Sequence, residues 1–218
     1  MKCQGDPCFL TSEYFFLMPH PDPIENLIKA LSRLPGLGRR SAERIALRLA
    51  QNPGRRVEDL VTALQDVQKT MTGCEICGGL TTRTQNPCGW CTDRTRDDSL
   101  LCVVETSSDL LLIEHSGGFK GRYFCLNARL SPARGEGVDD LQVPKLLSRI
   151  EALGPKEIIL ALNTDVESDA TASFLADVLH QKNVKVSRLA FGIPAGSGLA
   201  YADDLTLTRA LDGRQEID

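Results

Sequence analysis

KEIILALNTDVESDATASFLADVLH, residues 156–180, joins two kinds of sequence pattern through a short acidic segment. The apolar run at 156–162 has the length and the branched side chains of a buried strand. A helical pattern follows and is clearest over 168–181. Because strands that alternate with helices build sheets covered by those helices, this stretch predicts a mostly parallel sheet.

The same alternation extends through the second half of the chain. Further strand-type runs are LLCVVE (100–105), RYFCL (122–126) and VKVSRLA (184–190). Further helical stretches are Ser107–His115, Val143–Leu153 and Leu205–Leu211. We therefore expect an α/β domain over residues 99–190, followed by a C-terminal segment, 191–218.

Acidic residues follow two of the predicted strands. Glu105 ends one apolar run, and Asp165, Glu167 and Asp169 alternate after another, with Asp109 expected nearby. Ligands of α/β sheets gather outside the carboxyl ends of the strands, where such carboxylates could hold Mg²⁺. The alternative is that these acids only cap the helices that follow, a role that suits Asp169.

Four cysteines precede this domain in the stretch CEICGGLTTRTQNPCGWC, residues 74–91. Cys74, Cys77, Cys88 and Cys91 have the spacing C-x2-C-x10-C-x2-C, which presents two thiolate pairs to one ion. Four thiolates make a closed tetrahedral zinc site, so we predict a structural zinc module over residues 74–98. An iron–sulfur cluster and redox-active cysteines are the alternatives.

Two further cysteines, Cys102 and Cys125, lie inside strand-type runs and are expected to be small buried hydrophobic residues. Cys3 and Cys8 lie in residues 1–21, which lack periodicity and are expected to form a disordered leader.

The chain of 218 residues is 42% hydrophobic, and no apolar run approaches the roughly 20 residues of a membrane helix. We therefore expect a cytoplasmic protein that has no membrane partner.

Three helices are predicted over residues 22–73. The first begins at Asp22-Pro23 and ends at Pro35-Gly36, and the second runs from about Arg40 to Gln51. The third is predicted from Val57 to Met71, with Gly73 ending it. Its apolar face comprises Val57, Leu60, Val61, Leu64 and Met71.

The turn between the first two helices gathers positive charge. Residues 29–56 hold eight Lys/Arg and one acid, a local net charge of +7 in a chain whose net charge is −4. Glycines allow close backbone approach, and the start of the second helix favours a phosphate. The candidate DNA-binding residues are Gly36, Gly38, Arg39, Arg40, Arg44 and Arg48. The turn resembles a helix-hairpin-helix motif, although a solvated helical hairpin or a dimer contact is the alternative.

The order of these parts carries a wider resemblance. The acids after the strands resemble those of a Toprim domain, and the whole chain from about residue 22 resembles the RecR family of bacterial recombination mediators. The most specific stretches are LPGLGRRSAERIALRL (34–49), the cysteine spacing, LCVVE (101–105), GRYFCLNARLSP (121–132) and AYADDLTLTRALDGR (200–214). The loop NARLSPARGEGVDD (127–140) is more charged than expected for the family.

This resemblance implies a non-enzymatic DNA repair and recombination protein of the bacterial cytoplasm and nucleoid. It implies a ring-shaped homo-oligomer, a tetramer, that binds single- and double-stranded DNA and acts with RecO and RecF to load RecA on gapped DNA. By position, Arg40 and Arg44 would contact DNA, and Glu105, Asp165 and Glu167 would be the Toprim acids. The segment GIPAGSGLAYAD (192–203) resembles a Walker-B-like element that helps to close the ring.

A Toprim-type enzyme, such as a Mg²⁺-dependent nuclease, primase or topoisomerase, is the alternative function. Such chemistry needs a nucleophile or a positioned water beside the metal. None of the three tyrosines, Tyr14, Tyr123 and Tyr201, lies in a separate domain that could cleave a strand. We therefore predict no catalytic residue and expect the acids to form a docking surface for a basic partner, RecO.

Overall fold

The computed structural model describes residues 20–51, 54–190, 192–193, 196 and 198–214. The chain divides into two compact units, residues 1–69 and 70–218. The predicted leader, with Cys3 and Cys8, lies outside the described residues apart from its last two positions. No helix among the described residues is long and apolar enough to cross a membrane.

The first unit is built on a pair of helices, α1 (Asp22–Ser32) and α2 (Arg39–Gln51). Ile28 of α1 packs against Ala42 and Ala46 of α2, and all three side chains are fully buried. Small alanine side chains allow the two helices to approach closely. Gly36 has a φ of +79° in the connecting turn, a conformation that favours glycine.

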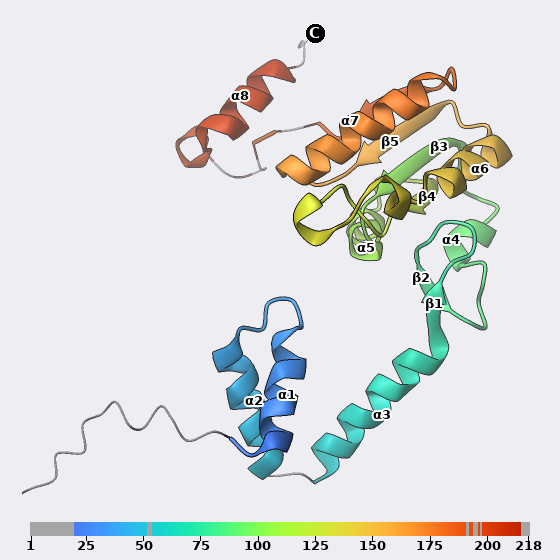
Figure 1. The fold of residues 1–218 in the computed structure, drawn as a ribbon. Helices are drawn as coiled ribbons and strands as arrows, with labels where there is room; N and C mark the ends of the chain where they lie inside the picture. The colour runs from blue at the N-terminus through green and yellow to red at the C-terminus, as the bar shows by residue number, and fades with distance from the viewer. Residues whose placement is uncertain (1–19, 52–53, 191, 194–195, 197, 215–218) are drawn as a thin grey trace, which may run out of the picture. The chain divides into compact units, whose positions relative to one another are not determined.

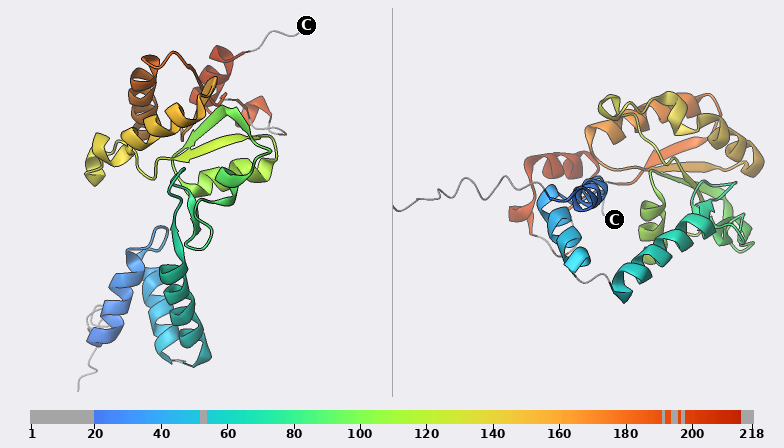
Figure 2. Two further views of the ribbon diagram at one scale, coloured as in Figure 1. Left: turned by 90° about the vertical axis from the view of Figure 1, so that its right-hand side faces the viewer. Right: turned by 60° about the horizontal axis from the view of Figure 1, so that its bottom comes forward.

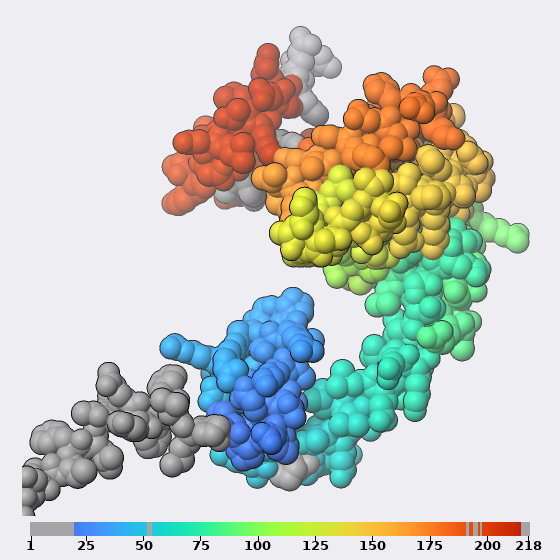
Figure 3. Space-filling model, viewed as in Figure 1, coloured from blue at the N-terminus to red at the C-terminus, as the bar shows by residue number. Residues whose placement is uncertain are grey.

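The third helix, α3, spans Arg55–Thr70, so its bounds differ from the predicted Val57–Met71. It ends before Met71, which lies in strand β1 (Met71–Gly73) because it pairs with Thr82. Its apolar side chains are not buried: Leu64 is 62% exposed and Val67 is 59% exposed. Figure 3 draws the atoms of α3 in cyan in a space-filling view.

The second unit begins with the cysteine module. Strands β1 and β2 (Leu80–Thr82) pair antiparallel, and the short helix α4 (Gly89–Thr92) follows. Several hydrogen bonds attach the module to the neighbouring domain, and two of them come from residues 125 and 127. The Cys125 amide donates to the Cys77 carbonyl at 2.7 Å, and the Asn127 side chain donates to the Gly78 carbonyl at 2.8 Å.

The remaining strands form a four-stranded sheet in the order β4-β3-β5-β6. The strands are β3 (Asp97–Val104), β4 (Gly121–Cys125), β5 (Glu157–Ala161) and β6 (Lys185–Arg188). Every neighbouring pair is parallel, which confirms the predicted parallel sheet. Their carboxyl ends therefore lie along one edge.

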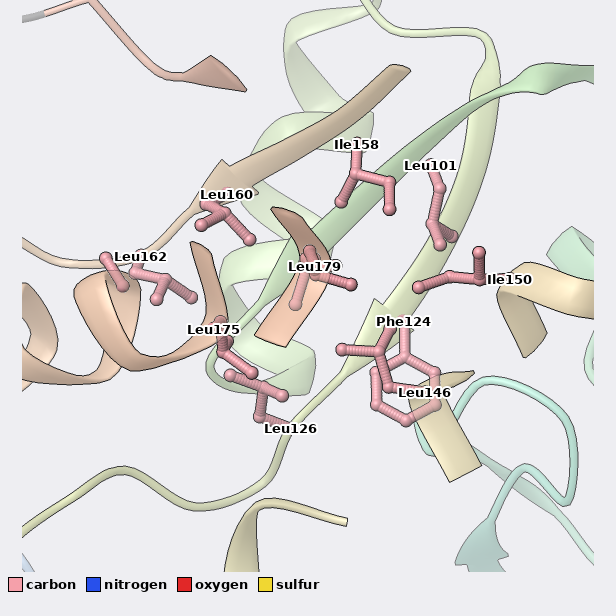
Figure 4. Close-up of a cluster of buried hydrophobic side chains, with 12 residues drawn as sticks. Leu101, Phe124, Leu126, Leu146, Ile150, Ile158, Leu160, Leu162, Leu175 and Leu179 are labelled. Atoms are coloured by element: carbon pink, nitrogen blue, oxygen red, sulfur yellow. The ribbon is translucent and has the colours of Figure 1, made fainter. Parts of the chain in front are cut away.

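Helices cover both faces of this sheet (Figures 1 and 2). On one face, alternate strand residues such as Leu101 and Phe124 pack against α6 (Val143–Leu153) and α7 (Val166–His180). Figure 4 shows this cluster, in which strand side chains point toward Leu146, Ile150, Leu175 and Leu179. On the other face, α5 (Ser107–Ser116) packs over Cys102, Tyr123 and Cys125.

The parts outside the sheet are short. Two 3-10 helices, Pro132–Arg134 and Val138–Leu141, lie between β4 and α6, and a third, Leu199–Tyr201, precedes the last helix, α8 (Asp204–Asp212). Helix α7 begins two residues earlier than predicted because Asp165 accepts a hydrogen bond from the Ser168 amide and caps it. Asp22 does not cap α1, since Pro21 occupies the capping position.

Candidate functional site

The four cysteines of the module converge on one point. Their sulfur atoms all lie within 4.8 Å of one another. Cys77 and Cys88 approach to 3.6 Å, and Cys74 and Cys91 to 3.9 Å. Gly78, with a φ of +73°, makes the tight turn that follows Cys77. The first three thiols are buried and Cys91 is half-buried, so the group is nearly closed to solvent.

Basic side chains of the α/β domain surround this group. Arg149 on α6 points a guanidinium nitrogen at the Cys91 sulfur, 3.8 Å away, and Lys145, one turn earlier, donates to the Cys74 carbonyl at 3.4 Å. Arg122 on β4 donates to the Cys91 carbonyl at 3.2 Å. Four thiolates around Zn²⁺ carry a net charge of about −2, which these cations offset.

The thiols alone could not ionise together. Contact with the Cys88 thiol, contact with Cys91 and burial raise the pKa of Cys77 above its ordinary value. A divalent cation removes this conflict because it deprotonates the thiols that coordinate it. The sulfur-only, tetrahedrally spaced donor set fits zinc, which would be structural because no position is left open for a substrate.

The predicted DNA-binding residues lie on α2 and the turn before it. Arg40, Arg44 and Arg48 are exposed, and their side chains form no ion pair with any residue that the structure describes. Arg39 differs, since it donates to both carboxylate oxygens of Glu25 on α1, at 2.9 and 3.1 Å. We define the exposed trio as the α2 arginine stripe. Gly36 and Gly38 face open space, so a ligand could approach the backbone there.

The predicted acids at the strand ends separate into two groups. Glu105 is 5% exposed and accepts hydrogen bonds from the Asn163 amide at 3.0 Å and from its side chain at 2.7 Å. Asp109 closes a capping box with Thr106 at the start of α5. Glu105 is therefore bound to the loop after β5, and Asp109 to the start of α5.

Asp165 and Glu167 share one basic partner, Arg129. The Arg129 guanidinium lies 2.9 Å from Asp165 and 3.0 Å from Glu167, and the Ser131 hydroxyl donates to Glu167 at 2.5 Å. Hydrogen bonding from the Ser168 amide, together with the charge of Arg129, holds the pKa of Asp165 below its ordinary range. Arg129, together with Glu105, also lines a pocket of about 270 Å³ at this edge of the sheet.

Sequence reasoning did not identify Arg129 as a partner of these acids. The signal that could have found it is the unusual charge of the loop 127–140, which follows β4 directly. The carboxyl ends of parallel strands meet at one edge, so a cation after β4 is placed beside acids that follow β5.

Cys102 and Cys125 are buried within the sheet, as predicted. Burial raises the pKa of each thiol to about 12, so both remain neutral at physiological pH. Neither belongs to the four-sulfur group.

Three family models match successive parts of the chain. Residues 24–68 match the family model described as RecR, helix-hairpin-helix, residues 99–190 match the Toprim domain, and residues 192–215 match RecR, C-terminal. Together with the parallel sheet and the four-cysteine group, these matches confirm the predicted architecture.

Similarity to curated proteins extends over nearly the whole chain. The recombination protein RecR of Moorella thermoacetica is 42% identical over 201 residues, which cover 92% of this chain and 100% of the relative. RecR of Syntrophobacter fumaroxidans is 43% identical over 196 residues, which cover 90% and 96% respectively. RecR of Desulforudis audaxviator is 41% identical over 200 residues, covering 92% of this chain and all of the relative. This chain belongs to the RecR family.

Proposed function

We propose that this protein is a DNA repair and recombination mediator of the bacterial cytoplasm and nucleoid. In this proposal it is an oligomeric DNA clamp that acts with RecO and RecF to promote RecA loading on gapped single-stranded DNA. It performs no chemistry of its own. The single observation that carries the DNA-binding part is the α2 arginine stripe, three exposed cations beside an open glycine turn.

The stripe suits a phosphate backbone better than it suits a base sequence. Arg40, Arg44 and Arg48 are spaced by four residues, so they lie along one side of the helix. Because no described residue neutralises them, their charge is available to a polyanion. Arg39 pairs with Glu25 on α1, so its charge is partly offset and less available to DNA than that of the stripe.

Salt-dependent binding tests the stripe directly. Each phosphate contact that is lost should reduce the slope of log affinity against log salt by about 0.7 to 0.9. Arg40→Ala/Arg44→Ala should therefore bind both single- and double-stranded DNA more weakly and with a shallower slope. Lys182→Ala/Lys185→Ala removes the same charge from two lysines that are each paired with a glutamate, and should leave binding unchanged. If the arginine variant kept the wild-type affinity and slope, the α2 arginine stripe would not be the DNA-binding surface.

The exposed apolar face of α3 supports the oligomeric part of the proposal. A helix of 16 residues with no buried side chain among those described gains little stability from its own unit. Burial of Leu60, Val61, Leu64 and Val67 against a second copy would remove this apolar surface from water. The C-terminal segment 191–218 would then help to close the ring.

The acidic edge of the sheet is the proposed docking surface for RecO. Asp165 is half exposed and Glu167 about one-third exposed, whereas Glu105 is buried and suits a structural role. Charge reversal at Glu167 should therefore weaken RecO binding in a pull-down while the free oligomer keeps its mass. Unchanged RecO binding would mean that RecO docks on another surface of the protein.

The Toprim match favours one other function, a Mg²⁺-dependent enzyme. Incubation of the protein with Mg²⁺ or Mn²⁺ and nicked, gapped or supercoiled DNA separates the two. Cleavage, relaxation or primer synthesis that disappears in Glu105→Gln would support the enzyme.

A further inference from the structure

The Toprim domain implies a divalent cation at the acids that follow its strands, and the residues of this chain do not fit one. Among the described residues, the four cysteines form the only group of three or more metal-ligating side chains close enough to share an ion. Glu105, Asp165 and Glu167 therefore do not converge as a carboxylate cage for Mg²⁺ would require.

A cation is nevertheless present among the acids, and it belongs to the protein. Arg129 places one guanidinium nitrogen 2.9 Å from Asp165 and another 3.0 Å from Glu167. The guanidinium group thus bridges two carboxylates, as a metal ion would. An arginine guanidinium also offers several N–H donors in a planar fork, a geometry that matches carboxylate oxygens.

Hydrogen bonds to α7 hold the loop that carries Arg129 in place. The Leu130 amide donates to the Thr171 hydroxyl at 2.9 Å, and that hydroxyl donates to the Glu167 carbonyl at 2.8 Å. Ser131 is fully buried, and its hydroxyl holds the second oxygen of Glu167. Arg129 is therefore positioned by its neighbours on the loop, and its side chain is only 21% exposed.

The third acid is held apart by its own contacts. Glu105 accepts hydrogen bonds on both oxygens, one from the backbone and one from the side chain of Asn163. Since each oxygen already has a donor, Glu105 does not need a cation to be stable in its buried position.

We propose that Arg129 is a built-in cation that takes the place of the divalent metal ion at this Toprim site. The site is then complete without Mg²⁺, and a metal ion could enter only by displacing the guanidinium group against like-charge repulsion. This inference concerns metal binding alone and does not depend on DNA binding or on oligomerisation.

Mn²⁺ binding to the zinc-loaded full-length protein, followed by the electron paramagnetic resonance signal of the free ion, tests the proposal. Arg129→Ala should bind one Mn²⁺ at least about tenfold more tightly than wild type, because a positive charge about 4 Å away is removed. Arg129→Gln, which keeps most of the side-chain volume, should show the same gain and guards against misfolding of the alanine variant.

Two further variants test whether the tighter Mn²⁺ binding of Arg129→Ala arises at the acids beside Arg129. Arg129→Ala/Asp165→Asn should lose it, while the asparagine can still cap α7. Lys182→Ala, which breaks the exposed pair with Glu151 elsewhere on the domain, should bind Mn²⁺ as wild type does. The proposal is overturned if wild type already binds Mn²⁺ as tightly as Arg129→Ala and Arg129→Gln. It is equally overturned if folded Arg129→Gln gains no site or if the gain survives Asp165→Asn.

Discussion

Gly78 lies where the backbone of the cysteine module comes close to the end of β4. A Cβ atom at this position would lie 2.7 Å from the Cys125 carbonyl oxygen and 3.3 Å from the Asn127 side chain. The backbone φ of +73° is also one that other residues rarely adopt. Steric conflict and backbone strain therefore act together at this position.

We expect Gly78→Ala to destabilise the second unit by about 1–3 kcal/mol or more. Gly117 provides the matched control, because its φ is +68° but its Cβ would meet open space. Gly117→Ala should therefore cost only the backbone strain. Chemical denaturation of both variants measures the difference, and equal losses of stability would mean that the close approach at Gly78 relaxes without cost.

Zinc should hold the cysteine module together, since thiolate coordination couples folding to metal binding. Cys74→Ser and Cys91→Ser should each lower the zinc content per chain and expose residues 70–98 to proteases. Cys102→Ala is the control, because Cys102 is buried in the sheet and lies outside the sulfur group. Full zinc content with unchanged cleavage in the two serine variants would contradict the structural role.

The four-cysteine group was predictable from the sequence, whereas the contacts of the acids were not. The cysteine pairs have short, fixed spacings, so the local turns bring their sulfurs together. The partner of Asp165 and Glu167 lies 36 to 38 positions away on another strand-end loop, and no local pattern relates Arg129 to them. The capping alternative for the acids matches the observed place of Asp165, since capping is a local interaction.

At the scale of elements, periodicity located the α-helices and strands of the sheet domain because those elements bury one or both faces, whereas it missed the two 3-10 helices between β4 and α6. It misplaced the end of α3, where the apolar residue Met71 continues the helical spacing. The antiparallel pairing of Met71 with Thr82 overrides that spacing. The spacing placed the apolar residues of α3 on one face, and most of that face is exposed in the structure.

We expect that exposed face to be an oligomer contact. Leu64→Glu places a charge at the centre of the face and should lower the mass measured by light scattering, because burial of an unpaired carboxylate is costly. Thr62 is exposed on the opposite side of α3, so Thr62→Glu adds the same charge and should keep the wild-type mass. The helical content of both variants, measured by circular dichroism, should match wild type.

An unchanged mass for Leu64→Glu would remove α3 from the interface. It would leave the apolar face without an explanation in the proposed assembly, and the contact would have to be sought in another element, such as the C-terminal segment.

At the scale of the whole molecule, charge is divided between a basic segment and an acidic remainder. Residues 29–56 carry a net charge of +7, which leaves −11 for the rest of the chain. We therefore expect DNA to be attracted to residues 29–56 and repelled elsewhere, which would confine binding to the α2 arginine stripe. One stripe of three arginines offers few phosphate contacts, so a single copy should bind DNA weakly.

Assembly should compensate for this weakness. In an oligomer, each stripe that reaches the same DNA raises the effective concentration of the next, and avidity can exceed single-site affinity by about 10²-fold or more. Leu64→Glu, if it dissociates the oligomer, should therefore lose DNA affinity on this scale and show a shallower salt slope, although its arginines are intact. Thr62→Glu adds the same negative charge to α3 and should bind as wild type does, which separates avidity from simple repulsion. Fluorescence anisotropy with a gapped duplex, at equal subunit concentration, measures both quantities. If the dissociated variant bound DNA with the wild-type affinity and slope, each subunit would act alone and the clamp would not depend on assembly.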